Sequence, residues 1–525
     1  MTLDQAPLSS APPDEVEADD AGAESSDSGG NDRYQPYLER FDRGLDWLAG
    51  NWPHLVVTAG VFAYFLYYRQ LTVEIHDGYG TSAFDIGVFD QGTWLLSQFK
   101  NPFVTITGRN LFGDHTSFIL LLVAPLYWVF PGASTLLTLQ AATMALGAVP
   151  VYLIGVSRLG KPLACVLAIV YLTHPALGAS NMENFHPDGF LALLVGMALY
   201  GAIEDKRKIF LVSVVLCMMV KEDMIIIILP LALWYAWKRH LRLGLVVAAL
   251  SGLWTLLAFR IIRSFNHGMD LQTGLRVPFG TADNPPTLRG VVETAYRQPG
   301  VFWDYLRSEE RPWYLWQMLI PTGFMFIFEP SVILIAAPVL FWNILSTFGY
   351  QHLIGYHYVM QIVPILTIGT IWGIARLKKV NQRRAAVALV AVLSVWTMYL
   401  WGPTSWGRNG EPGHWLPSNP AVAQFEEIRK QVPDDAVVSA FHSFVPHMDH
   451  RDRIYLWPVP WRAVYWGQVD KEGQKLDFTN DIEYLFIPTT LAPEDQALFD
   501  TFKDEFEVVA QNPGATLYKR VRPGA

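Results

Sequence analysis

The acidic residues most suited to chemistry lie in one polar segment, residues 71–133, between two apolar stretches. Four aspartates stand in it: Asp77, Asp85, Asp90 and Asp114. A carboxylate can take a proton from a reacting hydroxyl group when it is held within hydrogen-bond reach. Loop aspartates are commonly only solvated, but four of them in a segment rich in apolar and aromatic residues suggest a site. The segment therefore predicts an active site with three candidate catalytic acids: Asp85, Asp90 and Asp77.

Asp114 and His115 come just before an apolar stretch of the same segment. Asp114 could cap a helix there. With His115 it could also bind a divalent cation such as Mg²⁺ or Mn²⁺, or lie beside a phosphate group. Arg109, a few residues earlier, could supply positive charge to the same phosphate. All three are predicted to bind substrate, and Asp114 and His115 are also the candidate metal ligands.

Two later polar clusters interrupt apolar runs. Glu183 and His186 are three residues apart, which would place them on one face of a helical turn. Lys221 and Glu222 stand where two apolar runs meet with almost no loop between them, and charges at such a junction are costly unless they are paired or reach water. Lys221 could neutralise a phosphate or pair with a neighbouring acid. Substrate binding is predicted for all four, with plain solvation or local pairing as the alternative.

His352 and His357 flank the start of a further apolar run, among several tyrosines. Tyrosines collect at the membrane–water boundary. The cluster is therefore either an aromatic belt or a binding surface, and we predict substrate binding for the two histidines.

The elements that must position these residues are membrane helices. Of the 525 residues, 51% are hydrophobic and 17% are charged, and apolar runs of about 20 residues, the length that crosses a bilayer, recur along the chain. The sequence predicts an α-helical polytopic protein of the plasma membrane with about eleven transmembrane helices. The expected spans are 53–70, 134–157, 162–178, 188–203, 209–221, 223–237, 242–263, 313–328, 331–350, 357–375 and 385–402.

Three parts are expected along the chain. Residues 1–50 are predicted to be an acidic, disordered cytoplasmic tail, because the first 32 residues carry nine acids and no Lys or Arg. Residues 51–403 form the transmembrane domain, with outer loops at 71–133 and 264–312. Residues 404–525 are less apolar and predict a small extracytoplasmic α/β domain. No charge pattern points to nucleic acid as a partner.

The orientation follows from short basic loops, which face the cytoplasm. Arginines at 33–43 place the amino terminus in the cytoplasm, and the basic loops at 158–161 and 376–384 join it there only if Thr116–Phe130 does not cross the membrane. We therefore expect Thr116–Phe130 to lie on or dip into the outer leaflet, with the amphipathic Phe84–Phe99 alongside it. A crossing by Thr116–Phe130 is the alternative.

Three short motifs in the first outer loop resemble a known family. They are Phe84–Gln91 (FDIGVFDQ), Gly113–His115 (GDH) and Ala124–Tyr127 (APLY). They resemble the membrane family catalogued as domain of unknown function 2079, over about residues 55 to 400. That family is in turn similar to the GT-C superfamily of glycosyltransferases, which use sugars carried on polyprenyl phosphates.

The resemblance implies a GT-C-like fold and a mechanism. A polyprenyl-phosphate sugar would be the donor, and a glycan, lipid or protein of the cell envelope the acceptor, on the outer face of the lipid bilayer. Asp85 matches the catalytic acid best and would act as general base in an inverting transfer. Lys221, Arg109 or a metal near Asp114 would face the phosphate. The superfamily often has an acidic pair in this loop, whereas Asp85 is followed by Ile86, so Asp77 and Asp90 also stay candidates.

Two other classes of function fit some of these features. A transporter or flippase of a lipid-linked or small polar substrate would place ionisable groups or broken helices near the middle of the bilayer, and the expected span centres carry almost none. A membrane scaffold whose outer domain binds a wall component would leave the loop carboxylates without a role.

Overall fold

The computed structural model describes residues 35–266, 276–280, 286–408, 416–465 and 471–521. The chain divides into two compact units, Met1–Trp52 and Pro53–Ala525. Helix α1 (Gln35–Asp77) belongs to both and contains Pro53. Most of the acidic tail predicted for residues 1–50 lies outside the described residues.

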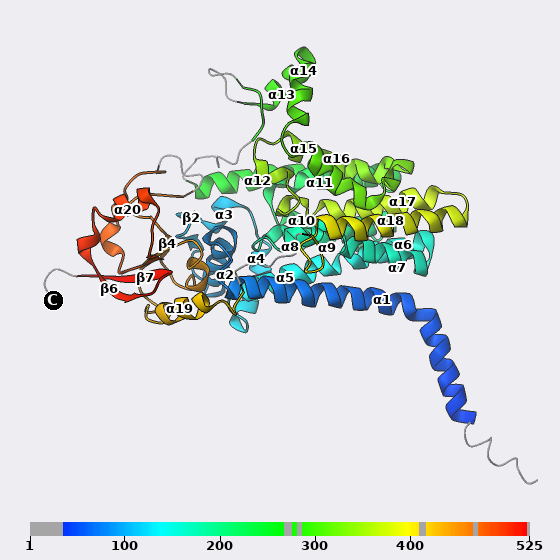
Figure 1. The fold of residues 1–525 in the computed structure, drawn as a ribbon. Helices are drawn as coiled ribbons and strands as arrows, with labels where there is room; N and C mark the ends of the chain where they lie inside the picture. Colours follow the sequence, from blue (N-terminus) through cyan, green and yellow to red (C-terminus); the bar gives the residue numbers. More distant parts are fainter. Residues whose placement is uncertain (1–34, 267–275, 281–285, 409–415, 466–470, 522–525) are drawn as a thin grey trace, which may run out of the picture. The chain divides into compact units, whose positions relative to one another are not determined.

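The second unit is mainly helical (Figure 1). After the first outer loop its longer helices are α5 (Ala133–Leu146), α6 (Ala148–Leu159), α7 (Lys161–Leu172), α8 (Pro175–Asn181), α9 (Leu191–Ile203), α10 (Arg207–Met218), α11 (Ile225–Lys238), α12 (Leu241–Phe265), α15 (Arg311–Leu319), α16 (Pro330–Leu345), α17 (Ile362–Arg376) and α18 (Val380–Trp401).

The predicted count of eleven spans is not confirmed. Among the described residues, four helices are long and apolar enough to cross a membrane: Ala133–Leu159, Leu241–Phe265, His357–Arg376 and Val380–Trp401. A fifth is possible if α7 and α8, bent by 43° at the break between them, form one span. The other expected spans contain helices that are shorter or interrupted, as at residues 313–328, where Gly323 has a φ of 57° and breaks the helix.

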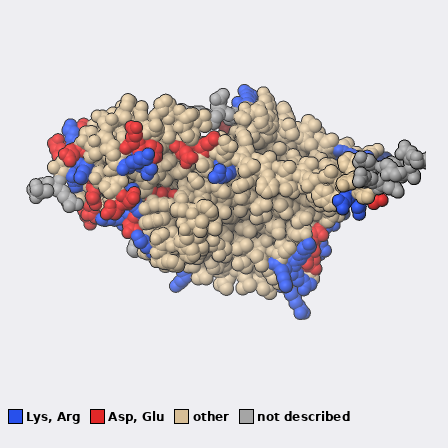
Figure 2. Space-filling model, turned by 90° about the horizontal axis from the view of Figure 1, so that it is seen from below, with Lys and Arg blue, Asp and Glu red and all other residues tan. Residues whose placement is uncertain are grey.

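The helices of this unit differ in how far they are enclosed. In the span that ends in α17, 83% of the most apolar stretch is buried within the protein, because α16, α6, α9 and α7 pack around α17. In α12 only 28% of that stretch is buried, and leucines such as Leu253 and Leu256 are exposed. Figure 2 shows a broad zone of one face with few charged residues, and Lys, Arg, Asp and Glu gather toward the two ends of that face. An exposed apolar zone of this kind is the surface that lipid covers.

The first outer loop folds into short elements rather than a span. It contains a π-turn (Ala83–Gly87), α2 (Val88–Ser97), β1 (Phe103–Val104), β2 (Arg109–Asn110), α3 (Leu111–Asp114), α4 (Leu120–Val123) and a 3-10 turn (Ala124–Trp128). Within Thr116–Phe130 the helical residues are therefore 120–128. At 1.5 Å rise per residue this stretch covers about half of a bilayer core of roughly 30 Å. The interpretation of Thr116–Phe130 as a non-crossing segment fits this structure.

The second outer loop, 264–312, contains two helices that the sequence analysis did not expect, α13 (Leu288–Arg297) and α14 (Pro299–Arg307). The side chain of Thr287 caps α13 by accepting a hydrogen bond from the backbone N–H of Gly290. Residues 267–275 and 281–285 of this loop lie outside the described residues.

The C-terminal region forms the expected small α/β domain. Its sheet has the order β4-β3-β5-β7-β6, with β3 (Val438–Ala440), β4 (Ile454–Leu456), β5 (Tyr484–Pro488), β6 (Phe506–Gln511) and β7 (Ala515–Arg520), and helices α19 (Pro420–Arg429) and α20 (Pro493–Phe499). β3 runs parallel to β4 and β5, and the pairs β5–β7 and β6–β7 are antiparallel. Strand β4 was not expected.

Candidate functional site

Asp85 occupies an unusual backbone conformation in the first outer loop. Its φ is 65° and its ψ is −92°, inside the π-turn that precedes α2. For a residue other than glycine, this backbone conformation costs about 1–3 kcal/mol of strain. Strained residues of this kind are typical of functional sites. The side chain is 31% exposed, and Oδ1 lies 3.0 Å from Nε2 of His186. The strained turn therefore holds one carboxylate at a place open to solvent.

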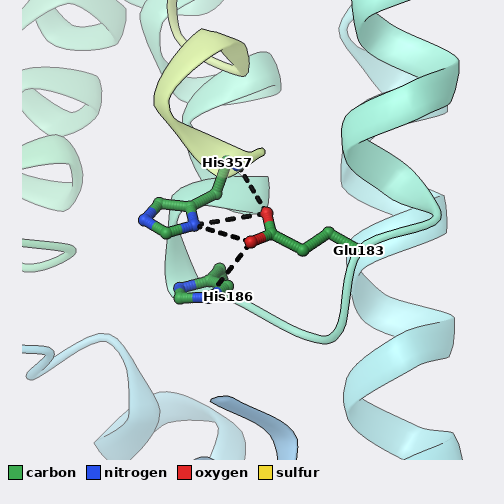
Figure 3. A group of neighbouring side chains, drawn as sticks. All are labelled: Glu183, His186 and His357. Carbon is green, nitrogen blue, oxygen red and sulfur yellow. Dashed lines mark hydrogen bonds and ion pairs between the residues drawn. The ribbon is translucent and has the colours of Figure 1, made fainter. Parts of the chain in front are cut away.

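Behind Asp85, three buried side chains form a cluster: Glu183, His186 and His357 (Figure 3). The backbone N–H of His357 donates to Oε2 of Glu183 at 2.5 Å, and its Nδ1 lies 3.2 Å from the same oxygen. The two imidazole rings are stacked, with centroids 3.5 Å apart and planes 19° apart. The loop between α8 and α9 thus supplies Glu183 and His186, and the 3-10 turn His357–Val359 before α17 supplies the third member.

The pKa values of this cluster follow from burial and from Asp85. Burial raises the pKa of Glu183 to about 8, although His186 opposes the shift. Burial alone would lower the pKa of His186, but the charge and hydrogen bond of Asp85 raise it to about 8. At neutral pH the Asp85 carboxylate therefore faces an imidazolium, and Glu183 is protonated.

A second polar group surrounds Lys221, at the junction of α10 and α11. Its Nζ lies 3.8 Å from Oδ1 of Asp188 and 5.5 Å from the centroid of the Tyr358 ring. Burial would lower the pKa of Lys221, but Asp188 and Asp223 raise it above its ordinary value, so the ammonium stays charged. Because 3.8 Å exceeds hydrogen-bond distance, this ion pair leaves the ammonium able to bind a further anion.

Glu222 ties the Lys221 group to the first outer loop. Its carboxylate lies 2.8 Å from Nδ1 of His115 and accepts a hydrogen bond from the backbone N–H of Thr116 at 3.2 Å. Burial would lower the pKa of His115, but Glu222 raises it. Asp85 and Lys221 are connected by another route. Asp85 contacts His186, which stacks on His357, and the next residue in the chain, Tyr358, lies beside Lys221.

An apolar groove of about 250 Å³ lies between α10 and α12 beside this site. Val215, Met218, Val247, Leu250 and Trp254 are among its lining residues. The groove also includes Met219, two residues before Lys221. The lining of this apolar groove therefore comes within two residues, along the chain, of the buried Lys221.

The other predicted catalytic acids lie elsewhere. Asp90, on α2, is buried and faces the C-terminal domain, where Nε2 of His450 is 3.2 Å away. Asp77 is exposed at the end of α1. Of the three candidates, Asp85 is the one in direct contact with Glu183's cluster.

Three predicted binding residues do not join the connected group. Nη2 of Arg109 donates to the carbonyl of Tyr465 at 3.2 Å and lies 3.5 Å from Asp114. His352 is buried beside Glu309, with Nε2 3.5 Å from its carboxylate. Arg109 thus links the loop to the C-terminal domain, and His352 contacts the second outer loop.

The metal site predicted at Asp114 and His115 stays a prediction. Within the described residues, two groups of three possible ligands have their atoms within 4.8 Å of one another: Glu183, His186 and His357, and Asp90, Asp449 and His450. Asp114 and His115 belong to neither, because they face different partners, Arg109 and Glu222.

Sequence reasoning missed several side chains at these places. Asp188 and Tyr358 lie beside Lys221, and Tyr127 and His450 both contact Asp90. Asp449-His450 repeats the Asp-His pair of Asp114-His115 and was the available signal.

Comparison with known proteins places this geometry in context. A family model described as "Predicted membrane protein (DUF2079)" matches residues 76–512. No curated protein matches the sequence. The fold is similar to ArnT from Cupriavidus metallidurans bound to undecaprenyl phosphate, with a TM-score of 0.57 and 14% identity over 90% of this chain and 99% of that one. The apo form of ArnT gives a TM-score of 0.55 and 13% identity over 90% and 98%.

Proposed function

Because the chain belongs to the DUF2079 family of predicted membrane proteins and has an ArnT-like fold, we propose that it is a membrane glycosyltransferase of GT-C type. It transfers a sugar from a polyprenyl-phosphate donor to an acceptor of the cell envelope on the outer face of the membrane. The acceptor is a glycan, a lipid or a protein.

The donor's lipid and phosphate have matching surfaces beside the site. The apolar groove between α10 and α12 suits a polyprenyl tail, and Lys221, two residues after the lining residue Met219, suits the phosphate. The ammonium would stabilise the charge that grows on the phosphate as the sugar leaves. ArnT bound to undecaprenyl phosphate is a protein of similar fold with a ligand of this class.

Asp85 would activate the acceptor. Its carboxylate takes the proton of the acceptor hydroxyl as the oxygen forms a bond to the anomeric carbon, and the bond from that carbon to the phosphate oxygen breaks. The products are the glycosylated acceptor and the free polyprenyl phosphate. Single displacement inverts the anomeric centre, as in inverting glycosidases. No step uses a metal at Asp114 and His115.

One observation carries the proposal: a strained, solvent-reachable Asp85 stands at one end of a buried polar group whose other end, Lys221, adjoins an apolar groove. A base, an anion site and a lipid channel are the three features that this transfer requires.

Asp85→Asn tests the proposal. The amide keeps the shape of the carboxylate but cannot accept the proton, so we expect transfer from a labelled polyprenyl-phosphate sugar to fall at least about 100-fold. Binding of the donor should be retained. Asp77→Asn, at the exposed end of α1, is the matched variant. Full activity in Asp85→Asn with loss in Asp77→Asn would assign the base to Asp77, and movement of intact labelled donor across vesicles would indicate a flippase instead.

A further inference from the structure

A second polar cluster lies where the first outer loop meets the C-terminal domain. Asp90 comes from α2, and Asp449 and His450 come from the segment between β3 and β4. The hydroxyl of Tyr127 donates to Oδ1 of Asp90 at 2.5 Å, and Nε2 of His450 lies 3.2 Å from the same oxygen. None of these four residues belongs to the group around Asp85.

One carboxylate oxygen in this cluster lacks a donor. Asp449 is 2% exposed, and no side chain or backbone group in the described part of the chain donates a hydrogen bond to its Oδ2. Asp90 is 1% exposed. Two buried carboxylates this close repel each other unless a proton or a cation lies between them. A buried acceptor without a partner is costly in free energy.

The cluster borders a polar cavity of about 340 Å³, which is large enough for hydrated ions or a small ligand. The cavity is lined by side chains of the first loop, the start of α5 and the C-terminal domain, among them His76, Asp90, Asp449 and His450. The ligand atoms of Asp90, Asp449 and His450 lie within 4.8 Å of one another.

We propose that Asp90, Asp449 and His450 bind one divalent transition-metal cation, Mn²⁺ or Zn²⁺, which fastens the C-terminal domain to the first outer loop. Two ligand atoms that share an ion of this kind are about 2.8–3.6 Å apart, since each lies about 2.0–2.2 Å from it and the angle between them is about 90–110°. The 3.2 Å between His450 Nε2 and Asp90 Oδ1 falls in this range. A mixed oxygen and nitrogen donor set favours Mn²⁺ or Zn²⁺ over Ca²⁺.

The cation would also affect Asp85, because Asp90 and Asp85 are close together in the chain. Asp90 stands on α2, and the strained turn of Asp85 directly precedes that helix. A cation that joins α2 to the C-terminal domain would therefore fix the helix on which the turn rests. The inference does not depend on the proposed sugar transfer.

Metal titration of the purified full-length protein tests the site. The protein is stripped with EDTA, and binding of Mn²⁺ and of Zn²⁺ alone is measured by calorimetry and by metal content after dialysis. We expect one saturable equivalent that survives Glu183→Gln and is weakened at least tenfold by Asp449→Asn and by His450→Gln. Asp452→Asn, two residues further on in an exposed pair with Lys100, should bind as the wild type does.

Amide hydrogen exchange of the wild type is a second measurement, which tests the site even if the variants do not fold. In the wild type, metal should slow amide hydrogen exchange in residues 445–451 and 88–92. If the stripped wild type binds neither ion saturably, or if Asp449→Asn binds as tightly as the wild type, the proposal is wrong and a shared proton between the two acids explains the cluster.

Discussion

Burial and the nearby charge of Asp85 set the pKa values of the two residues beside it, Glu183 and His186. Asp85 is partly exposed, whereas Glu183 is buried behind it and has a pKa of about 8. His186 stands between them with a pKa of about 8, because Asp85 outweighs the effect of burial. Glu183 and His186 therefore both hold a proton at neutral pH, each for a different physical reason.

The stability of the protein should fall as the pH rises through this cluster. Both pKa values are higher in the folded chain, about 8, than in the unfolded chain, where the usual values are 4.5 for Glu183 and 6.5 for His186. Between those values and pH 8 the folded state holds more protons than the unfolded state, so stability decreases with rising pH. The unfolding temperature of the wild type is expected to drop between about pH 6.5 and 8.5, and Glu183→Gln should reduce that slope. A slope unchanged by Glu183→Gln would contradict this assignment.

At the level of elements, the first outer loop protects the edge of the C-terminal sheet. β4 is an edge strand in the order β4-β3-β5-β7-β6, and exposed edges tend to pair with other chains. The side chain of Thr105 donates to the carbonyl of Ile454 at 2.5 Å, and the backbone N–H of Ile454 donates to the same hydroxyl at 3.0 Å. Gln91 holds Thr105 in place by a hydrogen bond to its backbone N–H at 3.1 Å.

Thr105→Val should destabilise this junction. Valine keeps the shape of threonine but leaves the N–H and the carbonyl of Ile454 without a partner, which costs about 1–3 kcal/mol for a buried group. We expect a lower unfolding temperature and faster amide exchange in residues 454–456. Thr107→Val is the matched control, because its hydroxyl contacts only Val104 of its own loop, at 3.5 Å. Equal effects of the two changes would show that the contact with β4 contributes nothing.

At the level of the whole second unit, the helices present an apolar zone to lipid and gather polar groups near one end of the bundle. The enclosed α17 and the exposed α12 mark the inner and outer positions. The groove between α10 and α12 opens on this apolar zone and ends near Lys221. A lipid substrate could therefore reach the site from the bilayer rather than from water.

Undecaprenyl phosphate should stabilise the wild type against heat by occupying the groove. At 100 times its dissociation constant a ligand adds about 2.7 kcal/mol. Leu250→Trp would fill the groove and abolish this shift, whereas Val246→Trp, on the same helix but outside the lining, should keep it. If Leu250→Trp retains the full shift, the lipid binds at another surface.

The sequence by itself determined the parts of the molecule whose signals are local. Membrane helices and four of the five C-terminal strands follow from apolar runs and alternation over a few residues. That Thr116–Phe130 does not cross the membrane stays a prediction from the basic loops. Apolar runs alone did not predict the number of membrane-spanning helices. Short or broken helices such as α10 and α15 carry an apolar run without the length of a span.

The tertiary structure alone decided which polar residues meet. It joined Asp85 to His186 and His357, turned Asp90 toward His450, and paired Asp114 with Arg109. These partners lie up to hundreds of residues apart, and no periodicity of the chain records which loops come together. Helix packing determines which loops lie side by side. One apolar helix face can pack against several others, and only the complete fold selects one of these arrangements.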